Sequence, residues 1–293
     1  MRRRWPVLAA TIPLLFGWVL VAAYPAAAST GIQGPGGLIQ PGGPISQLAS
    51  SSSGAGAQTG GVTPQVSGGQ SQVASGGRNT VVTSSNWAGY AATGSAGQFT
   101  SVSANWTQPA GHCTGGNQYS AFWVGLDGYS SSTVEQTGSE VDCAGRSPQY
   151  YAWYEIYPGA SATFPNPVSP GDQFSGSVTY QGSSKFQLVL KDTTKGWTQT
   201  VNATLAGAAL SSAEAIAEAP CCTARGGTLP LTNFCTVSFS SATANGKSMA
   251  TFNPVEITMP NTSVSAMTSV GNFTLSYTGY SSFPWPFGWP GGF

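Results

Sequence analysis

From about Thr80 onward, apolar and polar residues alternate along the chain in many short runs. Alternation places successive side chains on opposite faces of an extended strand, and Gly, Pro and Asn turns separate the runs. The runs with this period of two include residues 174–180, 186–190, 197–205, 237–239, 255–259 and 273–277. The pattern predicts an all-β domain over residues 80–293, a sandwich of two antiparallel sheets packed face to face.

One segment departs from this pattern. Residues 206–219 are rich in alanine, and Ser211 stands three residues before Glu214, as in a helix capping box. Glu214 and Glu218 would share a face in a helix and also in a strand. The local sequence therefore leaves helix and strand open for this segment.

The N-terminal residues, 1–28, have the three parts of a secretory signal peptide: a basic start, an apolar run over 7–23 and an alanine cleavage site at 26–28. An uncleaved membrane anchor is the alternative, because the apolar run approaches spanning length. We expect a secreted, extracellular protein that has no membrane association after signal cleavage. Residues 29–79, which are rich in Gly and Ser and contain no acidic residue, predict a disordered linker or pro-segment.

The chain carries little charge. Only 7% of its residues are charged and the formal net charge is zero, so nucleic acid is not an expected partner. Acid denaturation acts mainly by protonating paired carboxylates and charging buried histidines. Because the chain has ten acidic residues and a single histidine, His112, we expect tolerance of acid. The low charge is equally typical of an extracellular β protein rich in Gly, Ser and Thr.

The five cysteines are Cys113, Cys143, Cys221, Cys222 and Cys235. In an exported protein they are expected to be oxidised where geometry permits. A bond between the first two would close a loop of about 30 residues and stabilise the fold by roughly 3 to 4 kcal/mol. Cys235 would then pair with Cys221 or Cys222 and leave one thiol over. The spacing matches no zinc pattern, so we expect no metal and no other cofactor.

The single histidine limits the available chemistry, since the usual serine and cysteine hydrolases need an imidazole base. The sequence has no Gly-x-Ser-x-Gly elbow, phosphate loop or dinucleotide fingerprint, and Asp127-Gly128 has no second copy that would complete an aspartic dyad. Carboxylates remain, and those embedded in apolar or aromatic runs are Asp127, Glu155, Glu214 and Glu218. Glu155 shares a strand face with aromatic residues at 151, 153 and 157, which is typical of a substrate cleft or of a half-buried core strand.

Five motifs, in order along residues 80–237, resemble those of the glutamic peptidases, or eqolisins. They are Ser85-Asn-Trp-Ala-Gly89, Trp123-Val-Gly-Leu-Asp-Gly128, Val134-Glu-Gln-Thr-Gly138, Ala152-Trp-Tyr-Glu155 and Ala213-Glu-Ala-Ile-Ala-Glu218. The resemblance implies a secreted acid endopeptidase with a pro-segment, a lectin-like β-sandwich, protein or peptide substrates, and a strand rather than a helix over residues 206–219. We also expect a monomer.

The resemblance also implies the catalytic pair. Gln136 corresponds to the glutamine of the Gln-Thr-Gly motif, and Glu218 to the glutamate that closes the last motif. Glu218 would act as general base on a water, and Gln136 would donate to the oxyanion. This chain departs from the family at Ala215 and Ala217, where bulkier residues are usual, so Glu218 is expected to be less rigidly held. The expected substrate-binding residues are Trp87, Trp123, Asp127, Trp153, Glu155 and Glu214.

Two other functions remain open on the sequence. Lectin-like sandwiches with aromatic clefts also hydrolyse polysaccharides with two carboxylates, which here would be Glu155 and Glu218. A non-catalytic carbohydrate-binding module, with aromatic side chains stacked on sugars, is the third alternative.

Overall fold

The computed structural model describes residues 80–220 and 228–279, and these residues form sixteen strands and one short 3-10 helix, Met249–Phe252. The strands make two sheets, so the predicted all-β sandwich is confirmed. The expected signal peptide (1–28), the linker or pro-segment (29–79), Cys221 and Cys222 lie outside the described residues. None of the helical residues described is part of a helix long and apolar enough to cross a membrane.

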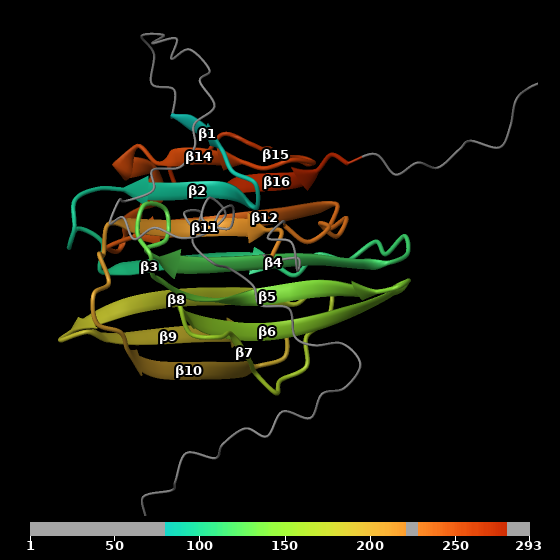
Figure 1. Cartoon of the computed structure of the whole chain (residues 1–293), viewed down its shortest axis with the longest axis horizontal. Helices are drawn as coiled ribbons and strands as arrows, with labels where there is room; N and C mark the ends of the chain where they lie inside the picture. The colour runs from blue at the N-terminus through green and yellow to red at the C-terminus, as the bar shows by residue number, and fades with distance from the viewer. Residues whose placement is uncertain (1–79, 221–227, 280–293) are drawn as a thin grey trace, which may run out of the picture. The chain divides into compact units, whose positions relative to one another are not determined.

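The first sheet, sheet A, has the strand order β1-β14-β2-β11-β4-β5-β6-β7 and is antiparallel except for the β1–β14 pair. Figure 1 shows this order from top to bottom. Its strands are β1 (Val81–Thr83), β2 (Trp87–Thr93), β4 (Asn117–Leu126), β5 (Val134–Ala144), β6 (Ser147–Tyr157), β7 (Ala162–Thr163), β11 (Ser212–Glu218) and β14 (Val255–Thr258).

The second sheet, sheet B, has the order β10-β9-β8-β3-β12-β16-β15, with β13 paired to β12. Its strands are β3 (Ser101–Thr107), β8 (Gln173–Gly182), β9 (Lys185–Asp192), β10 (Trp197–Thr204), β12 (Thr236–Ala244), β13 (Lys247–Ser248), β15 (Thr262–Val264) and β16 (Phe273–Tyr277). The alternating runs of the sequence correspond to β8, β9, β10, β12, β14 and β16, so these strand predictions are confirmed.

The main core lies between the two sheets and is built by this alternation. Phe122 and Val124 of β4 belong to the same buried cluster as Trp106, Phe174 and Phe239 of sheet B. Trp106 stacks on Phe174 with ring centroids 5.7 Å apart. The indole N–H of Trp106 also donates to the Ser139 hydroxyl across the sandwich at 2.8 Å, which satisfies a polar group inside an apolar core.

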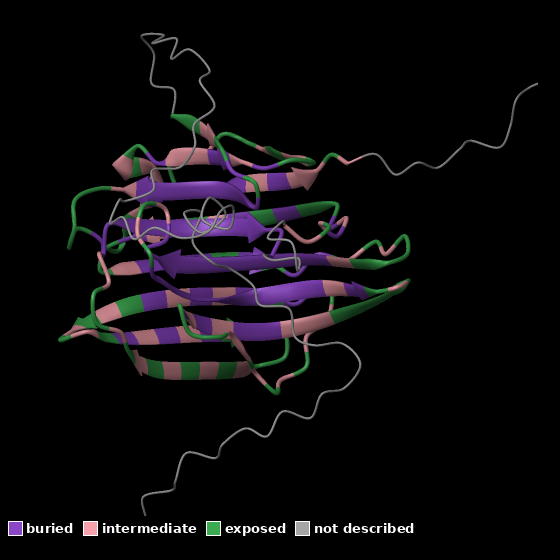
Figure 2. Cartoon of the chain, viewed as in Figure 1, coloured by how far each residue is buried: buried purple, intermediate pink, exposed green. Residues whose placement is uncertain are grey.

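The central strands of sheet A are buried on both faces. Figure 2 shows β2, β11 and β4 buried almost throughout, whereas β10 of sheet B alternates between partly buried and exposed residues. A second cluster of buried side chains lies on the face of sheet A that points away from sheet B, which we call the outer face. Its buried members are Trp87, Ala91, Ala121, Trp123, Val134, Trp153, Tyr157, Ile216 and Ile257.

The alanine-rich segment forms the central strand β11, not a helix. It pairs antiparallel with β2 on one side and β4 on the other, so strand ladders satisfy its backbone from both sides. Ala215 and Ala217 are fully buried in the main core, and Ile216 lies in the outer-face cluster. Small side chains here allow close sheet packing, and this tertiary gain overrides the helix propensity of alanine.

One disulfide, Cys113–Cys143, is present among the described residues and confirms that pairing. It joins the segment before β4 to the end of β5 across a sequence separation of 30 residues. Cys235 is an exposed free thiol at a left-handed turn position, with φ 54°. The second disulfide expected at Cys235 is therefore not formed in this structure.

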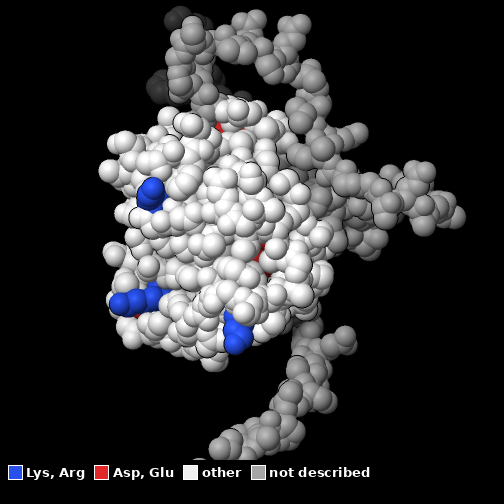
Figure 3. Space-filling view, turned by 90° about the vertical axis from the view of Figure 1, so that its left-hand side faces the viewer, with Lys and Arg blue, Asp and Glu red and all other residues white. Residues whose placement is uncertain are grey.

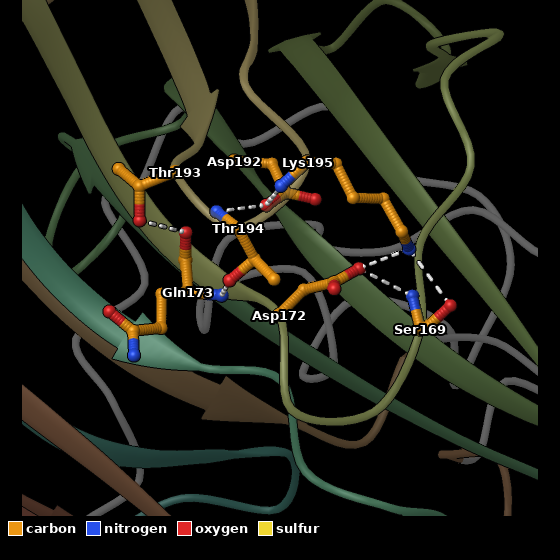
Figure 4. Close-up of polar contacts among 7 residues, drawn as sticks. All are labelled: Ser169, Asp172, Gln173, Asp192, Thr193, Thr194 and Lys195. Carbon is orange, nitrogen blue, oxygen red and sulfur yellow. Dashed lines mark hydrogen bonds and ion pairs between the residues drawn. The ribbon is translucent and has the colours of Figure 1, made fainter.

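The edge of sheet B is tied together by the loops that join β7 to β8 and β9 to β10. Lys195 pairs with the buried carboxylate of Asp172 and also donates to the Ser169 hydroxyl at 2.8 Å. Asp192 accepts the backbone N–H groups of Thr194 and Lys195, each at 2.9 Å, and so closes the turn between β9 and β10 (Figure 4). These acids have local structural partners and lie apart from the outer face of sheet A.

Most acidic residues lie inside the protein. All ten are described, and eight of them are buried: Asp127, Glu135, Glu140, Glu155, Asp172, Asp192, Glu214 and Glu218. The face drawn in Figure 3 accordingly shows a few separated basic groups and very little acidic surface. Burial of an unpaired carboxylate is costly in the ionised form, and it raises the pKa values of Glu135, Glu140 and Glu214.

Candidate active site

Three rows of side chains cross the outer face of sheet A, each formed by residues in register on β11, β4, β5 and β6. The rows are Glu218, Ala121, Glu140, Tyr151; then Ile216, Trp123, Gly138, Trp153; then Glu214, Gly125, Gln136, Glu155. On β4, the outward-facing residue between the polar residues of β11 and β5 is small in two of these rows: Ala121 in the first and Gly125 in the third. Polar groups of β11 and β5 therefore face each other across β4 in the outer two rows.

The carboxylate of Glu218 is held by two N–H donors. The indole Nε1 of Trp123 donates to Oε2 at 2.9 Å, and the amide Nδ2 of Asn86 donates to Oε1 at 3.0 Å. All three residues are fully buried. Hydrogen bonds to the charged form favour that form, so both donors stabilise the negative charge of Glu218.

Trp123 occupies its position because two neighbouring residues are glycines. A Cβ on Gly138 would lie 2.6 Å from Cβ of Trp123 and 2.3 Å from the backbone oxygen of Phe122. A Cβ on Gly125 would lie 2.9 Å from Cζ3 of the Trp123 ring. These contacts explain physically why a glycine closes the Gln-Thr-Gly motif, since it leaves space for the tryptophan that contacts Glu218.

Gln136 is oriented by a neighbouring acid. Its amide Nε2 donates to Oε2 of Glu155 at 2.7 Å, and the two residues are directly opposite each other on β5 and β6. Both are fully buried. Val134 lies in the outer-face cluster two residues before Gln136, so the alternation of β5 places Gln136 on the same face.

Two further acids of β5 lie near Glu218: Glu140 is in its row, and Asp142 follows two residues later on the same face. Burial, followed by the neighbouring Asp142, raises the pKa of Glu140 well above its ordinary value, and the charge of Glu218 adds to this. Burial also raises the pKa of Asp142 to about 6, while a hydrogen bond with Glu140 acts in the opposite direction. In mild acid both groups are therefore neutral.

Glu214 is a different kind of carboxyl group from Glu218. It is fully buried, and among the described residues neither of its oxygens has a hydrogen-bond partner of good geometry. Burial, followed by a hydrogen bond to Ser212 that acts in the opposite direction and by the nearby charges of Asp127 and Glu135, leaves its pKa well above the ordinary value. Glu214 is consequently protonated in acid.

Asp127 has a structural position at the end of β4. Its carboxylate accepts the backbone N–H groups of Leu210 at 2.7 Å and Ser211 at 2.9 Å, and so fixes the loop that leads into β11. Asp127 itself has φ 68°, a left-handed conformation that Asp tolerates better than most residues. Its expected contact with substrate stays a prediction.

The aromatic residues expected to bind substrate gather on the same face. Trp87 meets Trp123 edge to face, with ring centroids 4.8 Å apart, and Trp153 lies in the same cluster. The indole nitrogens of Trp87 and Trp153 have no hydrogen-bond partner in the structure. They are two buried donors that a carbonyl group could satisfy.

The structure places Gln136 and Glu218 on the same face of the same sheet, on strands separated by β4. They are in different rows, since Gln136 is opposite Gly125 and Glu218 is opposite Ala121. Sequence reasoning missed Asn86, Glu140 and Asp142. Asn86 stands in the first of the five motifs, so the motif itself was the available signal, whereas no local pattern distinguishes the two acids.

Comparison with known proteins agrees with this arrangement. A model of the Peptidase A4 family matches residues 85–278. The chain belongs to this family. The resemblance to the glutamic peptidases is therefore confirmed, and the protein is a glutamic peptidase that acts on proteins or peptides.

Two solved structures show the relationship in detail. Scytalido-glutamic peptidase with a transition state analogue inhibitor is 28% identical, with a TM-score of 0.56, and the match covers 66% of this chain and 98% of that chain. SCP-B, a member of the eqolisin family in complex with the tripeptide Ala-Ile-His, is 27% identical, with a TM-score of 0.52 and the same coverage. A search of curated proteins gave no match. Membership of the Peptidase A4 family favours a peptidase over the glycosidase and carbohydrate-binding alternatives.

Proposed function

We propose that this glutamic peptidase is a secreted endopeptidase that works in acid, with Glu218 as general base and Gln136 as oxyanion donor. The observation that carries the proposal is the pair of N–H donors on Glu218, from Trp123 at 2.9 Å and Asn86 at 3.0 Å. A general base must be ionised, and these donors favour ionisation. Its neighbours Glu140 and Glu214 have raised pKa values, so they are unsuited to this role in acid.

Gln136 suits the second role because an amide does not titrate. Its contact with Glu155 orients the amide, and we assign the amide nitrogen as the donor to the oxyanion. Glu155 is thus a positioning residue for Gln136 in this proposal. A pre-oriented N–H donor stabilises the charge that develops on the substrate carbonyl oxygen without reorganising in the transition state.

The reaction then proceeds in two steps. Glu218 takes a proton from a water molecule while the water oxygen bonds to the carbonyl carbon, and the resulting oxyanion accepts the Gln136 N–H. The oxyanion then reforms the carbonyl as the C–N bond breaks, and protonated Glu218 delivers its proton to the leaving nitrogen. The products are a carboxylic acid and an amine, and Glu218 returns to its ionised state.

The substrate lies between β11 and β5 in this proposal, above Trp123 and Gly125. The indole N–H groups of Trp87 and Trp153, which have no partner among the described residues, would donate hydrogen bonds to substrate carbonyl oxygens. Gln136 and Glu218 are both fully buried in this structure, so substrate binding requires the outer face to become accessible. Secretion is supported by the Cys113–Cys143 disulfide, which is typical of exported proteins.

Digestion of denatured casein between pH 3 and 5 tests the proposal. We expect Glu218→Gln to abolish cleavage and Gln136→Ala to reduce it nearly as far, with the fold intact by circular dichroism. Glu135→Gln is the matched control, because it makes the same chemical change next to Gln136 but on the other face of β5. The control is expected to cleave at nearly the wild-type rate. Full activity of Glu218→Gln would overturn the proposal.

A further inference from the structure

The segment before β2 brings a polar side chain directly against Glu218. Asn86 is fully buried, and its Nδ2 donates to Oε1 of Glu218 at 3.0 Å over a sequence separation of 132 residues. The backbone reinforces this contact, because the N–H of Ala219 donates to the Asn86 carbonyl at 2.8 Å. Trp87 and Glu218 are register partners in the β2–β11 ladder. Asn86 is therefore fixed to the same ladder as Glu218.

Ser84 decides which end of the Asn86 amide faces Glu218. The Ser84 hydroxyl oxygen accepts the backbone N–H groups of Asn86 at 3.3 Å and Trp87 at 3.1 Å. With two donors directed at its oxygen, the hydroxyl hydrogen points to Oδ1 of Asn86, 3.2 Å away. An amide oxygen only accepts hydrogen bonds, so its contact with Ser84 leaves the NH₂ end for the carboxylate.

The reversed amide would place Oδ1 against Oε1 of Glu218, two acceptors in a buried site. That arrangement would favour a protonated Glu218 and remove it as a base. Ser84 is itself buried, and its own N–H donates to the Thr258 carbonyl at 2.8 Å, so the seryl group is anchored to β14.

Three other polar groups near Glu218, those of Trp123, Glu140 and Asp142, do not perform this function. Trp123 donates to the opposite oxygen, Oε2, and its indole cannot be reversed in the same way. Glu140 approaches across Ala121 from β5, and Asp142 follows it on the same face. Both acids are neutral in mild acid and become negative as the pH rises, so they oppose ionisation of Glu218 rather than support it.

We propose that Ser84 and Asn86 are positioning residues of this peptidase, which act as a relay that holds Glu218 ionised and correctly oriented in acid. The relay runs from the Ser84 hydroxyl through the Asn86 amide to Oε1 of Glu218. It deepens the proposed function, because it rests on Glu218 being the general base. It assigns to both residues a role that is exerted through Glu218.

The test follows the ionisation of Glu218 directly. In protein labelled with ¹³C at the glutamate carboxyl carbon, the Glu218 signal, assigned by its loss in Glu218→Gln, is titrated by NMR. We expect Asn86→Ala to move its titration midpoint upward by about one pH unit, the effect of losing one hydrogen bond to a charged group. Ser84→Ala, which keeps the amide but frees its orientation, should move it in the same direction by less.

The pH dependence of kcat/KM is the second measurement. The acid limb of the profile should shift upward by the same amount as the NMR midpoint in each variant. Asn245→Ala is the control for the loss of a hydrogen-bonded asparagine side chain. The exposed Asn245, in the turn after β12, accepts the backbone N–H of Thr100 at 2.8 Å and donates to the backbone oxygen of Gln98 at 2.7 Å. This change should leave both the midpoint and the acid limb unchanged.

The outcomes separate the two proposals. An unchanged Glu218 midpoint in Asn86→Ala overturns the relay whatever the activity, and so does an equal shift in Asn245→Ala. A shifted midpoint combined with full activity of Glu218→Gln would keep the relay as an electrostatic device but overturn the catalytic role of Glu218. Should Asn86→Ala not fold, an unchanged midpoint in Ser84→Ala overturns the relay.

Discussion

The indole N–H of Trp123 lies 2.9 Å from Oε2 of Glu218, although the two residues are separated by 95 positions in sequence. They meet because β4 and β11 are paired with Trp123 opposite Ile216, so that the indole reaches the carboxylate two residues further along β11. Gly125 and Gly138 leave room for the tryptophan to lie close against the sheet, because a Cβ at either position would clash with it. A structural aromatic residue thus becomes a hydrogen-bond donor to the proposed base.

Trp123→Phe tests this donor while preserving an aromatic ring. A hydrogen bond to a charged group contributes about 1.5 to 3 kcal/mol, so we expect kcat/KM at pH 4 to fall by roughly 10- to 150-fold. The melting temperature should change far less than the activity. Peptide hydrolysis and thermal unfolding measured on the same preparation check both. An unchanged kcat/KM would show that the indole N–H does not support Glu218.

Gly138→Ala should be severely destabilising. The added methyl group would lie 2.3 Å from the Phe122 carbonyl oxygen and 2.6 Å from Cβ of Trp123, in a part of sheet A that cannot expand. We expect a loss of about 3 kcal/mol or more, or failure to fold. Gly145→Ala is the control, because the turn there has open space and only its φ of 66° opposes alanine. That change should lower the free energy of unfolding by only about 1 kcal/mol, as denaturant titration can show.

Stability should be greatest in acid and decrease toward neutral pH. Burial, followed by the charge of Asp127, raises the pKa of Glu135 to about 8, and burial raises that of Asp142 to about 6. A carboxyl group with a raised folded pKa contributes stability that is complete below its unfolded value, near 4, and is lost as the pH rises through the folded value. Each such group lowers the free energy of unfolding by up to about 1.4 kcal/mol per pH unit in that interval.

Thermal unfolding between pH 3 and 8 measures this effect. The melting temperature should fall from about pH 5 upward, and Glu135→Gln should make the decrease less steep because it removes one titrating group. A melting temperature that rises toward pH 7 would contradict the assignment of protonated, buried acids. The composition predicted acid tolerance from the scarcity of titratable groups, whereas the structure predicts it from where those groups lie.

Removal of the disulfide should weaken the fold without removing the proposed chemistry. Cys113 and Cys143 close a loop with a sequence separation of 30, which the chain-entropy model values at roughly 3 to 4 kcal/mol. The double change Cys113→Ser with Cys143→Ser should lower the free energy of unfolding by that amount in urea titrations. Cleavage below the new melting temperature should remain near the wild-type rate, and a complete loss of activity in folded protein would argue for a direct role in the site.

The sequence could predict the strands because their side chains sample the two faces of a sheet in strict alternation. The period of two in residues 174–180 or 273–277 appears in β8 and β16 because one face of sheet B is buried and the other is exposed. The same reasoning fails over 206–219. β11 is buried on both faces, its two glutamates fit one face of a helix as well as one face of a strand, and local propensity favours a helix. The family resemblance correctly gave a strand there.

By itself, the sequence determined the fold class and the family, because each of these depends on local periodicity or on short motifs. Only the tertiary structure decided how the carboxyl groups differ. Glu214 and Glu218 are four residues apart on the same face of one strand, and both are buried. Burial raises the pKa of Glu214, whereas Glu218 accepts hydrogen bonds from Asn86 and Trp123. The charge of a buried carboxyl group depends on donors and charges brought to it from other strands, and no local sequence pattern records which strands those are.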